Sequence, residues 1–312
     1  MNEFELIARW FARPTKRARL GVGDDCALLS LRPGFEFAIS TDMLVADRHF
    51  LSDVDPEALG WKTLAVNLSD LAAMGAEPLA FTLALALPAI DEAWLDGFAR
   101  GLFACATAHD CELVGGDTTR GPLTLSVTIV GEVPTGMALR RDGACVDDDV
   151  WVSGTLGDAA LALDALVAGR VVDASARERL DRPTPRIALG RALRGIAAAA
   201  IDVSDGLAQD LGHILERSRV GATLVPSRLP MTAIVREHVD AGRFALAGGD
   251  DYELCFTAPR ANRDAVETVA RSTGTAVTRI GTIVAEPGLR LVDDAGGTLD
   301  DAPALTGFDH FA

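Results

Sequence analysis

Hydrophobic and polar positions switch between helical and strand-like spacing along the first half of the chain. Apolar residues recur every three or four positions in two segments, which predicts two helices. Shorter apolar runs before, between and after these segments predict strands. The predicted helices cover residues 56–74 and 92–108, and the predicted strands cover residues 35–40, 81–87 and 123–130. Helices and strands that alternate in this way are typical of a compact α/β domain.

A polar and acidic stretch at residues 136–149 interrupts this pattern. Because the stretch has no strong periodicity, it indicates a junction between an N-terminal domain over 1–138 and a C-terminal domain over 139–312. Periodicity then resumes. Helices are predicted near 158–169, 186–196, 208–217 and 260–271, and strands near 150–152, 199–201, 253–257 and 277–281.

The composition is that of an ordinary globular protein. Of the 312 residues, 49% are hydrophobic, which is enough for a substantial core and for two domains. No apolar run approaches the roughly 20 residues that span a bilayer. Glu3 and Glu5 stand where a signal peptide would be positively charged, so we expect a cytoplasmic protein. The five cysteines are scattered and form no CxxC pair, so we expect them to be reduced core residues.

The charge of the chain narrows the choice of partners. A net charge of −16 disfavours nucleic acids and anionic membranes, because phosphate backbones require a basic surface. Lys16 and Lys62 are the only lysines, and the sequence has no G-x-x-x-x-G-K-[ST] motif, which excludes a Walker-type kinase. A phosphate substrate is still compatible with this acidity, since carboxylates can hold divalent cations that in turn hold phosphates.

Acidic residues recur beside glycine or small polar residues, and we interpret five of these six places as loops at strand ends. They are Gly23-Asp24-Asp25, Ser40-Thr41-Asp42, Asp70, Gly115-Gly116-Asp117, Asp202-Val203-Ser204-Asp205-Gly206 and Gly248-Gly249-Asp250-Asp251. A single such turn ordinarily makes only local hydrogen bonds. If the turns converge, however, carboxylates about 4 Å apart repel by roughly 4 kcal/mol at an effective dielectric of 20, so bound cations are needed. Several Mg²⁺ ions held in this way would position and neutralise the β- and γ-phosphates of a nucleotide.

Three further residues are candidates for ligand contacts. Arg141 could reach a phosphate bidentately, although an arginine in a junction loop is more often simply solvated. His49 follows the acidic Ser40–Asp42 stretch and is either a structural histidine or a ligand contact. Phe308 lies near the C-terminus, where an aromatic residue either anchors the tail or stacks on a flat heteroaromatic ring.

Seven segments in order resemble the thiamine-monophosphate kinase family, and the resemblance runs nearly from end to end. They are GVGDDCALL (21–29), ISTDMLVADRHF (39–50), KTLAVNLSDLAAMGAEP (62–78), LVGGDTTRGPL (113–123), IDVSDGLAQDLGHI (201–214), GGDDYELCF (248–256) and FDHF (308–311).

This resemblance implies a fold similar to that of aminoimidazole ribonucleotide synthetase. The N-terminal α/β domain would bind ATP and magnesium, and its four strands would complete a barrel with four from a partner in a homodimer. The C-terminal domain would be α+β, with the active site in a cleft between the two domains.

The resemblance also implies roles for individual residues. Magnesium ligands would be Asp25, Ser40, Thr41, Asp42, Asp70, Asp117, Asp202 and Asp205. Nucleotide contacts would be Gly116, Asp117, Arg141 and Ser204, and contacts to thiamine monophosphate would be His49, Asp250 and Phe308. Two positions depart from the family pattern: the family usually has Glu where this chain has Asp250, and commonly Tyr or Trp where it has Phe308.

The expected reaction is direct in-line transfer of the γ-phosphate of ATP to thiamine monophosphate, which gives thiamine diphosphate. The acceptor oxygen of a phosphate monoester is already anionic at neutral pH, because its second pKa lies near 6, so no general base is expected. Asp42, Asp70 and Asp117 would form a metal clamp instead. Two alternatives remain open at this stage. One is a sister ATP-dependent synthetase that makes selenophosphate or aminoimidazole ribonucleotide, and the other is a non-catalytic dimer that binds divalent cations.

Overall fold

The computed structural model describes residues 2–299 and residue 307. Phe308, the expected aromatic contact to the substrate, lies outside the described residues. The chain divides into two compact units. The N-terminal unit comprises Met1–Leu71 and Ala76–Gly136, and the C-terminal unit comprises Ala72–Gly75 and Met137–Ala312.

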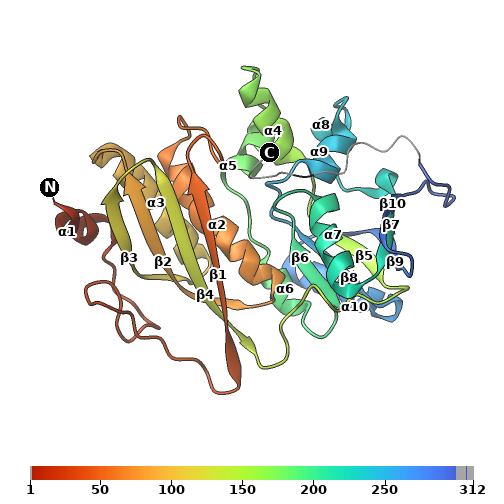
Figure 1. Ribbon diagram of the computed structural model, residues 1–312, viewed down its shortest axis with the longest axis horizontal. Helices are drawn as coiled ribbons and strands as arrows, with labels where there is room; N and C mark the ends of the chain where they lie inside the picture. The colour runs from red at the N-terminus through yellow and green to blue at the C-terminus, as the bar shows by residue number, and fades with distance from the viewer. Residues whose placement is uncertain (1, 300–306, 308–312) are drawn as a thin grey trace. The chain divides into compact units, whose positions relative to one another are not determined.

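The N-terminal unit is built on a four-stranded mixed sheet in the order β1-β4-β2-β3 (Figure 1). Its elements are α1 (Glu3–Leu6), the π-helix η1 (Ile7–Phe11), β1 (Phe35–Val45), α2 (Pro56–Ala73), β2 (Glu77–Leu87), α3 (Glu92–Ala108), β3 (Glu112–Arg120) and β4 (Thr124–Pro134). Strand β4 pairs antiparallel with β1 and β2, whereas β2 and β3 are parallel. Strands β1 and β3 are therefore the two edges of this sheet.

The two faces of this sheet differ in character. One face carries fully or almost fully buried residues such as Leu85, Val127 and Ile129, and helices α2 and α3 lie on it (Figure 1). The opposite face of β1 carries Ile39 and Met43, whose exposed fractions are 63% and 54%. An edge strand with a large exposed apolar face is unusual in a soluble protein, because it is a ready surface for association.

Helices α2 and α3 begin where the sequence predicts them, and they pack closely. The side chain of Asp55 accepts a hydrogen bond from the backbone N–H of Ala58, which caps the start of α2. Asp91 caps α3 in the same way, through the N–H groups of the first helical turn. A Cβ atom at Gly101 would lie 1.7 Å from the carbonyl oxygen of Glu57, so glycine allows the two helix backbones to touch.

The C-terminal unit is built on a six-stranded mixed sheet in the order β10-β7-β9-β5-β8-β6. Its strands are β5 (Asp149–Ser153), β6 (Ala199–Asp202), β7 (Gly221–Leu224), β8 (Leu254–Ala258), β9 (Val277–Val284) and β10 (Gly288–Leu291). Its helices are α4 (Asp158–Val167), α5 (Ala174–Asp181), α6 (Ile187–Ala192), α7 (Leu207–Ser218), α8 (Ala233–Arg236), α9 (Ala241–Ala247) and α10 (Arg263–Thr273), with 3-10 turns η2 (Pro226–Arg228) and η3 (Arg260–Asn262).

The core of this unit lies between the sheet and α7. Apolar residues of α7 at helical spacing, Leu207, Leu211 and Ile214, are fully buried in one cluster with Val150 and Val152 of the central strand β5. All five residues of β5 are buried, as expected for a central strand covered on both faces.

The prediction of a two-domain α/β protein is confirmed, and both sheets are mixed, while the barrel across a homodimer remains a prediction. Neither sheet closes on itself within residues 2–299. The interpretation of Ser40–Asp42 and Gly115–Asp117 as loops at strand ends was wrong, because both lie inside strands, β1 and β3. The expectation of core cysteines holds for three of the five, while Cys26 and Cys145 are exposed. Within the described part of the chain, no helix is both long and apolar enough to span a bilayer.

Candidate active site

Strand β1 and helix α2 bring together three of the predicted magnesium ligands. Ser40 and Asp42 alternate with exposed residues, so they face the side of the sheet on which α2 lies. The Ser40 hydroxyl donates a hydrogen bond of 2.5 Å to Oδ2 of Asp70 on α2. The third predicted ligand, Asp42, is fixed through its backbone N–H, which donates to Oδ1 of Asn67 at 3.1 Å. One short stretch of strand and one helical turn thus hold Ser40, Asp42 and Asp70 as neighbours.

Asn67 is a residue to which sequence analysis gave no role. Its side chain is buried, with an exposed fraction of 1%, and its amide nitrogen donates to the carbonyl oxygen of Thr63 at 3.0 Å. The amide oxygen is thereby aimed at the N–H of Asp42. The three-residue spacing from Asp70 was the only indication in the sequence that Asn67 belongs to this corner.

Thr41 faces the opposite side of the sheet. Its hydroxyl lies 2.9 Å from the hydroxyl of Thr128 on the neighbouring strand β4. A magnesium ion could reach Thr41 and Asp42 together only at the edge of β1, because successive residues of a strand face opposite ways.

Asp117 lies on the edge strand farthest from β1, three strand spacings or about 14 Å away from Asp42. The cross-strand register is a row of Asp42, Val127, Leu83 and Gly116, followed by a row of Met43, Ser126, Ala84 and Asp117. Paired residues share a face, so Asp117 and Asp42 face opposite sides of the sheet of one chain.

Gly116 is required by the sheet itself. Its φ is +148°, and a Cβ atom at this position would lie 1.9 Å from the carbonyl oxygen of Leu83 on β2. Packing between β2 and β3 therefore explains this glycine without any contact to a nucleotide.

Asp25 is exposed and lies near the tip of a loop. Leu20 and Leu28 form an isolated antiparallel bridge, which closes the loop below Asp25. After Asp25, the side chains of Ala27 and Leu29 pack against a hydrophobic cluster that includes Val114 of β3.

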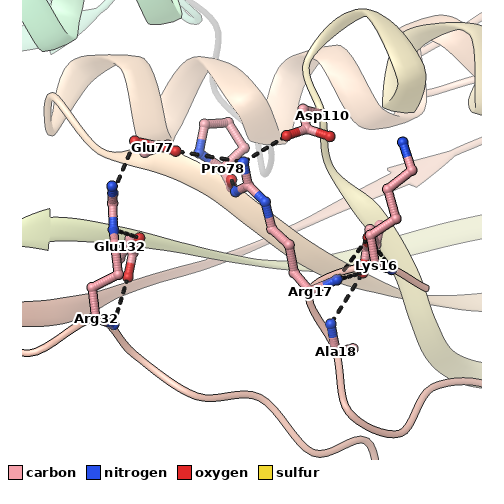
Figure 2. A network of polar contacts seen from close by, with 9 residues as sticks. Lys16, Arg17, Ala18, Arg32, Glu77, Pro78, Asp110 and Glu132 are labelled. Carbon is pink, nitrogen blue, oxygen red and sulfur yellow. Dashed lines mark hydrogen bonds and ion pairs between the residues drawn. The ribbon is translucent and has the colours of Figure 1, made fainter.

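Two polar clamps fix this segment to the sheet (Figure 2). Before the loop, the Glu112 carboxylate accepts hydrogen bonds from the backbone N–H groups of Lys16 at 2.6 Å and of Arg17 at 3.1 Å. The Arg17 guanidinium in turn donates to Pro78 O at 2.9 Å and forms an ion pair of 2.5 Å with Asp110.

After the loop, Arg32 forms an ion pair of 2.9 Å with Glu77 and a second one with Glu132. Glu77 also reaches Arg17, at 3.5 Å, so it joins the two clamps. The position of Asp25 is thus set by contacts on both sides of it in the sequence.

His49 lies in the turn after β1 and is half-buried. Its Nδ1 accepts a hydrogen bond from the backbone N–H of Val45 at 3.1 Å, which orients the ring against the end of β1. This bond accounts for a structural role, and the contact to thiamine monophosphate stays a prediction.

In the C-terminal unit, the predicted magnesium ligand Asp202 ends β6, and the predicted nucleotide contact Ser204 and magnesium ligand Asp205 lie on the turn that leads to α7. Asp202 is buried and pairs with Leu254 of β8. The turn is tight: Gly206 has a φ of +123°, and a Cβ atom there would lie 2.8 Å from the Cα of Ala247. Only glycine can occupy that position without a shift of the backbone.

Asp210 holds this turn together, and sequence analysis assigned it no role. Its Oδ2 accepts hydrogen bonds from three successive backbone N–H groups, those of Ser204, Asp205 and Gly206, at 3.0, 3.1 and 3.1 Å. Burial raises the pKa of Asp210 to about 7, and the nearby Asp205 carboxylate adds to this rise, while the three donors oppose it.

The turn that carries Asp250 packs directly on the Ser204 turn. The N–H of Asp250 donates to Ser204 O at 2.8 Å, and the N–H of Tyr252 donates to Val203 O at 2.8 Å. Gly249, Asp250 and Tyr252 all have positive φ values, of 70°, 60° and 49°. A conformation of this kind is costly outside glycine and is often found at functional sites. The structure therefore brings the predicted nucleotide contact Ser204 next to the predicted substrate contact Asp250.

Tyr252 orients the Asp250 carboxylate. Its hydroxyl donates to Oδ1 of Asp250 at 3.0 Å, and its ring is buried, with an exposed fraction of 8%. Tyr252 is the only tyrosine of the chain. Its position two residues after Asp250 was the one indication in the sequence that these side chains could meet.

Two buried acids follow on the same segment. Asp251 accepts a hydrogen bond from the N–H of Gly157 at 2.9 Å, while its Oδ2 has no partner among the described residues. Burial raises the pKa of Asp251 well above its ordinary value. Glu253, fully buried, forms ion pairs with Arg179 at 2.6 Å and Arg186 at 2.5 Å. These contacts fix the base of the Asp250 turn.

The predicted nucleotide contact Arg141 and the residue before Phe308 also belong to the C-terminal unit. Arg141 is exposed, and its backbone oxygen accepts a hydrogen bond from the hydroxyl of Ser218 at 2.8 Å. Gly307, directly before Phe308, lies against the Asp205 turn, since a Cβ atom there would be 2.3 Å from Asp205 O. Gly307 thus lies at the Asp205 turn.

The donor set of these two places suits a hard cation. Hydroxyl and carboxylate oxygens are the ligands that Mg²⁺ prefers, and the predicted ligands include no histidine or cysteine. Within residues 2–299 and 307, no group of three or more His, Cys, Asp and Glu side chains is close enough to hold a metal ion. The Ser40–Asp70 hydrogen bond brings two of the predicted ligands into direct contact.

Comparison with known proteins places both units in one class. Residues 23–133 match the family model of the AIR synthase related protein, N-terminal domain, and residues 146–294 match that of its C-terminal domain. The thiamine-monophosphate kinase of Salmonella typhimurium is 49% identical over 324 residues, which cover 100% of this chain and 98% of that protein. The chain belongs to the thiamine-monophosphate kinase family.

Solved structures agree with this assignment. The crystal structure of thiamine-monophosphate kinase from Stenotrophomonas maltophilia K279a has a TM-score of 0.85 and 49% identity, and covers 95% of this chain and 96% of that one. The structure of AaThiL complexed with AMPPCP and TMP has a TM-score of 0.79 and 30% identity, and covers 90% of this chain and 89% of that one.

Proposed function

We propose that this protein phosphorylates thiamine monophosphate to thiamine diphosphate, with ATP as the phosphate donor and Mg²⁺ as the metal. The observation that carries the proposal is the full-length similarity, at 49% identity, to a thiamine-monophosphate kinase. A structural neighbour that was solved with AMPPCP and TMP supports the choice of both substrates. A cytoplasmic location stays a prediction from the sequence.

The N-terminal unit would supply the larger part of the metal site. Asp42 and Asp70 with the hydroxyl of Ser40 would hold magnesium, and Asp25 would add a ligand from its clamped loop. Magnesium would neutralise the charge of the phosphates and so lower the repulsion between two anions. In this arrangement no protein group needs to remove a proton, because the acceptor phosphate is already ionised.

The C-terminal unit would supply the remaining contacts. Asp202 and Asp205 would hold magnesium, Ser204 would contact the nucleotide, and Asp250 would contact thiamine monophosphate. Backbone hydrogen bonds between the Ser204 and Asp250 turns support this proposal, because they fix the two contacts in one frame. Arg141, His49 and Phe308 complete the proposed set.

We further propose that the active protein is a homodimer in which the metal site is shared. The exposed apolar face of the edge strand β1 supports an association through the sheet. Two ligands of one Mg²⁺ lie within about 4 Å of each other, since each Mg–O distance is about 2.1 Å. Asp42 and Asp117 of one chain are on opposite edges and opposite faces of the sheet, so we pair Asp42 with Asp117 of a second copy.

The proposed activity is tested by ADP release with three acceptors measured in parallel: thiamine monophosphate, free thiamine and water. We expect rapid ADP release only with thiamine monophosphate, and only when Mg²⁺ is present. Equal ADP release with free thiamine would contradict the assignment of thiamine monophosphate as the substrate. Equal ADP release with water as the only acceptor would indicate an ATPase.

A further inference from the structure

Three backbone N–H groups of the turn that precedes helix α7 converge on a single acceptor. Successive N–H groups of Ser204, Asp205 and Gly206 point to one place at the N-terminal end of a 12-residue helix. Such a run of donors, together with the positive end of the helix dipole, is a common way to bind phosphate. Here all three N–H groups donate to a single oxygen atom of the chain itself.

That oxygen belongs to a well-shielded side chain. Asp210 has an exposed fraction of 3%, and it lies in the first turn of α7, so its carboxylate folds back over the start of its own helix. Removal of the carboxylate would leave three backbone donors without this partner. An internal acceptor of this kind both fixes the turn and occupies the place that a phosphate oxygen would otherwise take.

We propose that Asp210 is a positioning residue that makes the Asp202–Gly206 turn a cation site instead of a phosphate site. With its N–H groups occupied, the turn presents the Asp205 carboxylate to a ligand. Negative charge from the Asp205 carboxylate favours a cation there and repels a bare phosphate. The backbone N–H groups of this turn are then not available to the phosphates of the nucleotide, which the turn would hold through Mg²⁺ and the Ser204 side chain.

The neighbouring contacts show why the orientation of the turn matters. The carbonyl oxygen of Ser204 accepts a hydrogen bond from the N–H of Asp250. Gly249 packs against the same oxygen, since a Cβ atom on Gly249 would lie 2.7 Å from it. Gln209 donates to Oδ2 of Asp205 at 3.4 Å, which holds the carboxylate near the start of the helix. Loss of the hydrogen bonds to Asp210 would therefore alter the position of the Asp205 carboxylate.

The inference rests on the proposed function, and its test separates the two. Binding of AMPPCP is measured by calorimetry as Mg²⁺ is raised, for the wild-type protein and for Asp210→Ala and Asp210→Asn. Asp149→Asn serves as the matched control, because Asp149 is equally buried and is paired with Arg263 at 2.5 Å in the same unit. The midpoint of thermal unfolding, Tm, is recorded for each variant.

We expect Asp210→Ala to need at least about tenfold more Mg²⁺ for half-maximal nucleotide binding, as is usual when a residue that orients a metal ligand is removed. Asp210→Asn keeps one acceptor oxygen, so its shift should be smaller and it should fold if the alanine variant does not. Asp149→Asn should lower Tm and leave the Mg²⁺ midpoint unchanged.

Two results would overturn the inference. The first is that the Asp210 variants need the same Mg²⁺ concentration as the wild-type protein for half-maximal nucleotide binding. The second is that Asp149→Asn raises this Mg²⁺ concentration as much as the Asp210 variants do, which would indicate general destabilisation. A wild-type protein that binds AMPPCP equally well with and without Mg²⁺ would instead contradict the proposed function, and the inference with it.

Discussion

A pair of inactive variants should restore each other's activity if the metal site is shared between two chains. Asp42→Asn and Asp117→Asn each remove one carboxylate from the proposed site. In a dimer that contains one chain of each kind, one site combines both substitutions and the other combines Asp42 and Asp117 in their native form. We therefore expect a purified mixed dimer to have about half the wild-type turnover, since one of two sites is intact.

The expected magnitude follows from the geometry of the sheet. Within one chain the two aspartates are about 14 Å apart, too far for a common Mg²⁺ ion, whose ligands lie within about 4 Å of one another. Each variant alone should be strongly impaired, because the metal clamp has lost a charge.

The assay is ADP release by dimers that carry two different affinity tags and have been purified through both. A mixed dimer of Asp42→Asn and Asp70→Asn is the matched control. Ser40, Asp42 and Asp70 lie at one corner of one chain, so in this control both sites carry a substitution and activity should stay low. If the Asp42–Asp117 mixed dimer is as inactive as the control, the shared site is wrong.

Three other changes test parts of the account. Asp70→Asn should reduce turnover steeply and leave Tm nearly unchanged, and near-normal turnover in saturating Mg²⁺ would argue against a role for Asp70 in the metal site. Tyr252→Phe removes the hydroxyl that orients Asp250, so KM for thiamine monophosphate should rise by about tenfold, equivalent to about 1.4 kcal/mol, with kcat nearly unchanged; an unaltered KM would refute this role. Asp251→Asn should stabilise the protein relative to wild type, and increasingly so as pH rises above about 4. Above that pH Asp251 ionises in the unfolded chain but stays protonated in the folded protein, where its pKa is raised, so the wild-type protein loses stability and the asparagine variant does not. Urea unfolding at pH 4 and pH 7 measures this difference, and a variant that is less stable than wild type at pH 7 would contradict it.

The helices of the N-terminal unit could be predicted from the sequence because their signals are local. Asp55 with Pro56 and Asp91 are capping residues whose effect does not depend on the rest of the fold. The same local reasoning shortened β1, since polar Thr41 and Asp42 read as the end of a strand. They stay in the strand because β4 supplies partners as far as Val45.

The spatial relations within the site could not be predicted, since they depend on register. The sequence groups Asp42 and Asp117 by composition, and only strand order and pairing reveal that they face opposite ways in one chain. Asp210 was hidden for a similar reason. The first turn of the helix places its carboxylate beside the N–H groups of the residues before the helix. An acidic residue within a helical pattern does not by itself predict such a contact.

The central claim is the direct transfer of phosphate from ATP to thiamine monophosphate. Its most direct test is a single-turnover experiment with ATP labelled in the γ-phosphate, in which label is followed into thiamine diphosphate and into protein. We predict that label appears in thiamine diphosphate at the rate at which ATP is lost, and that none is bound to protein at any time. Label that passes through the protein, or that appears only in inorganic phosphate, would contradict the account.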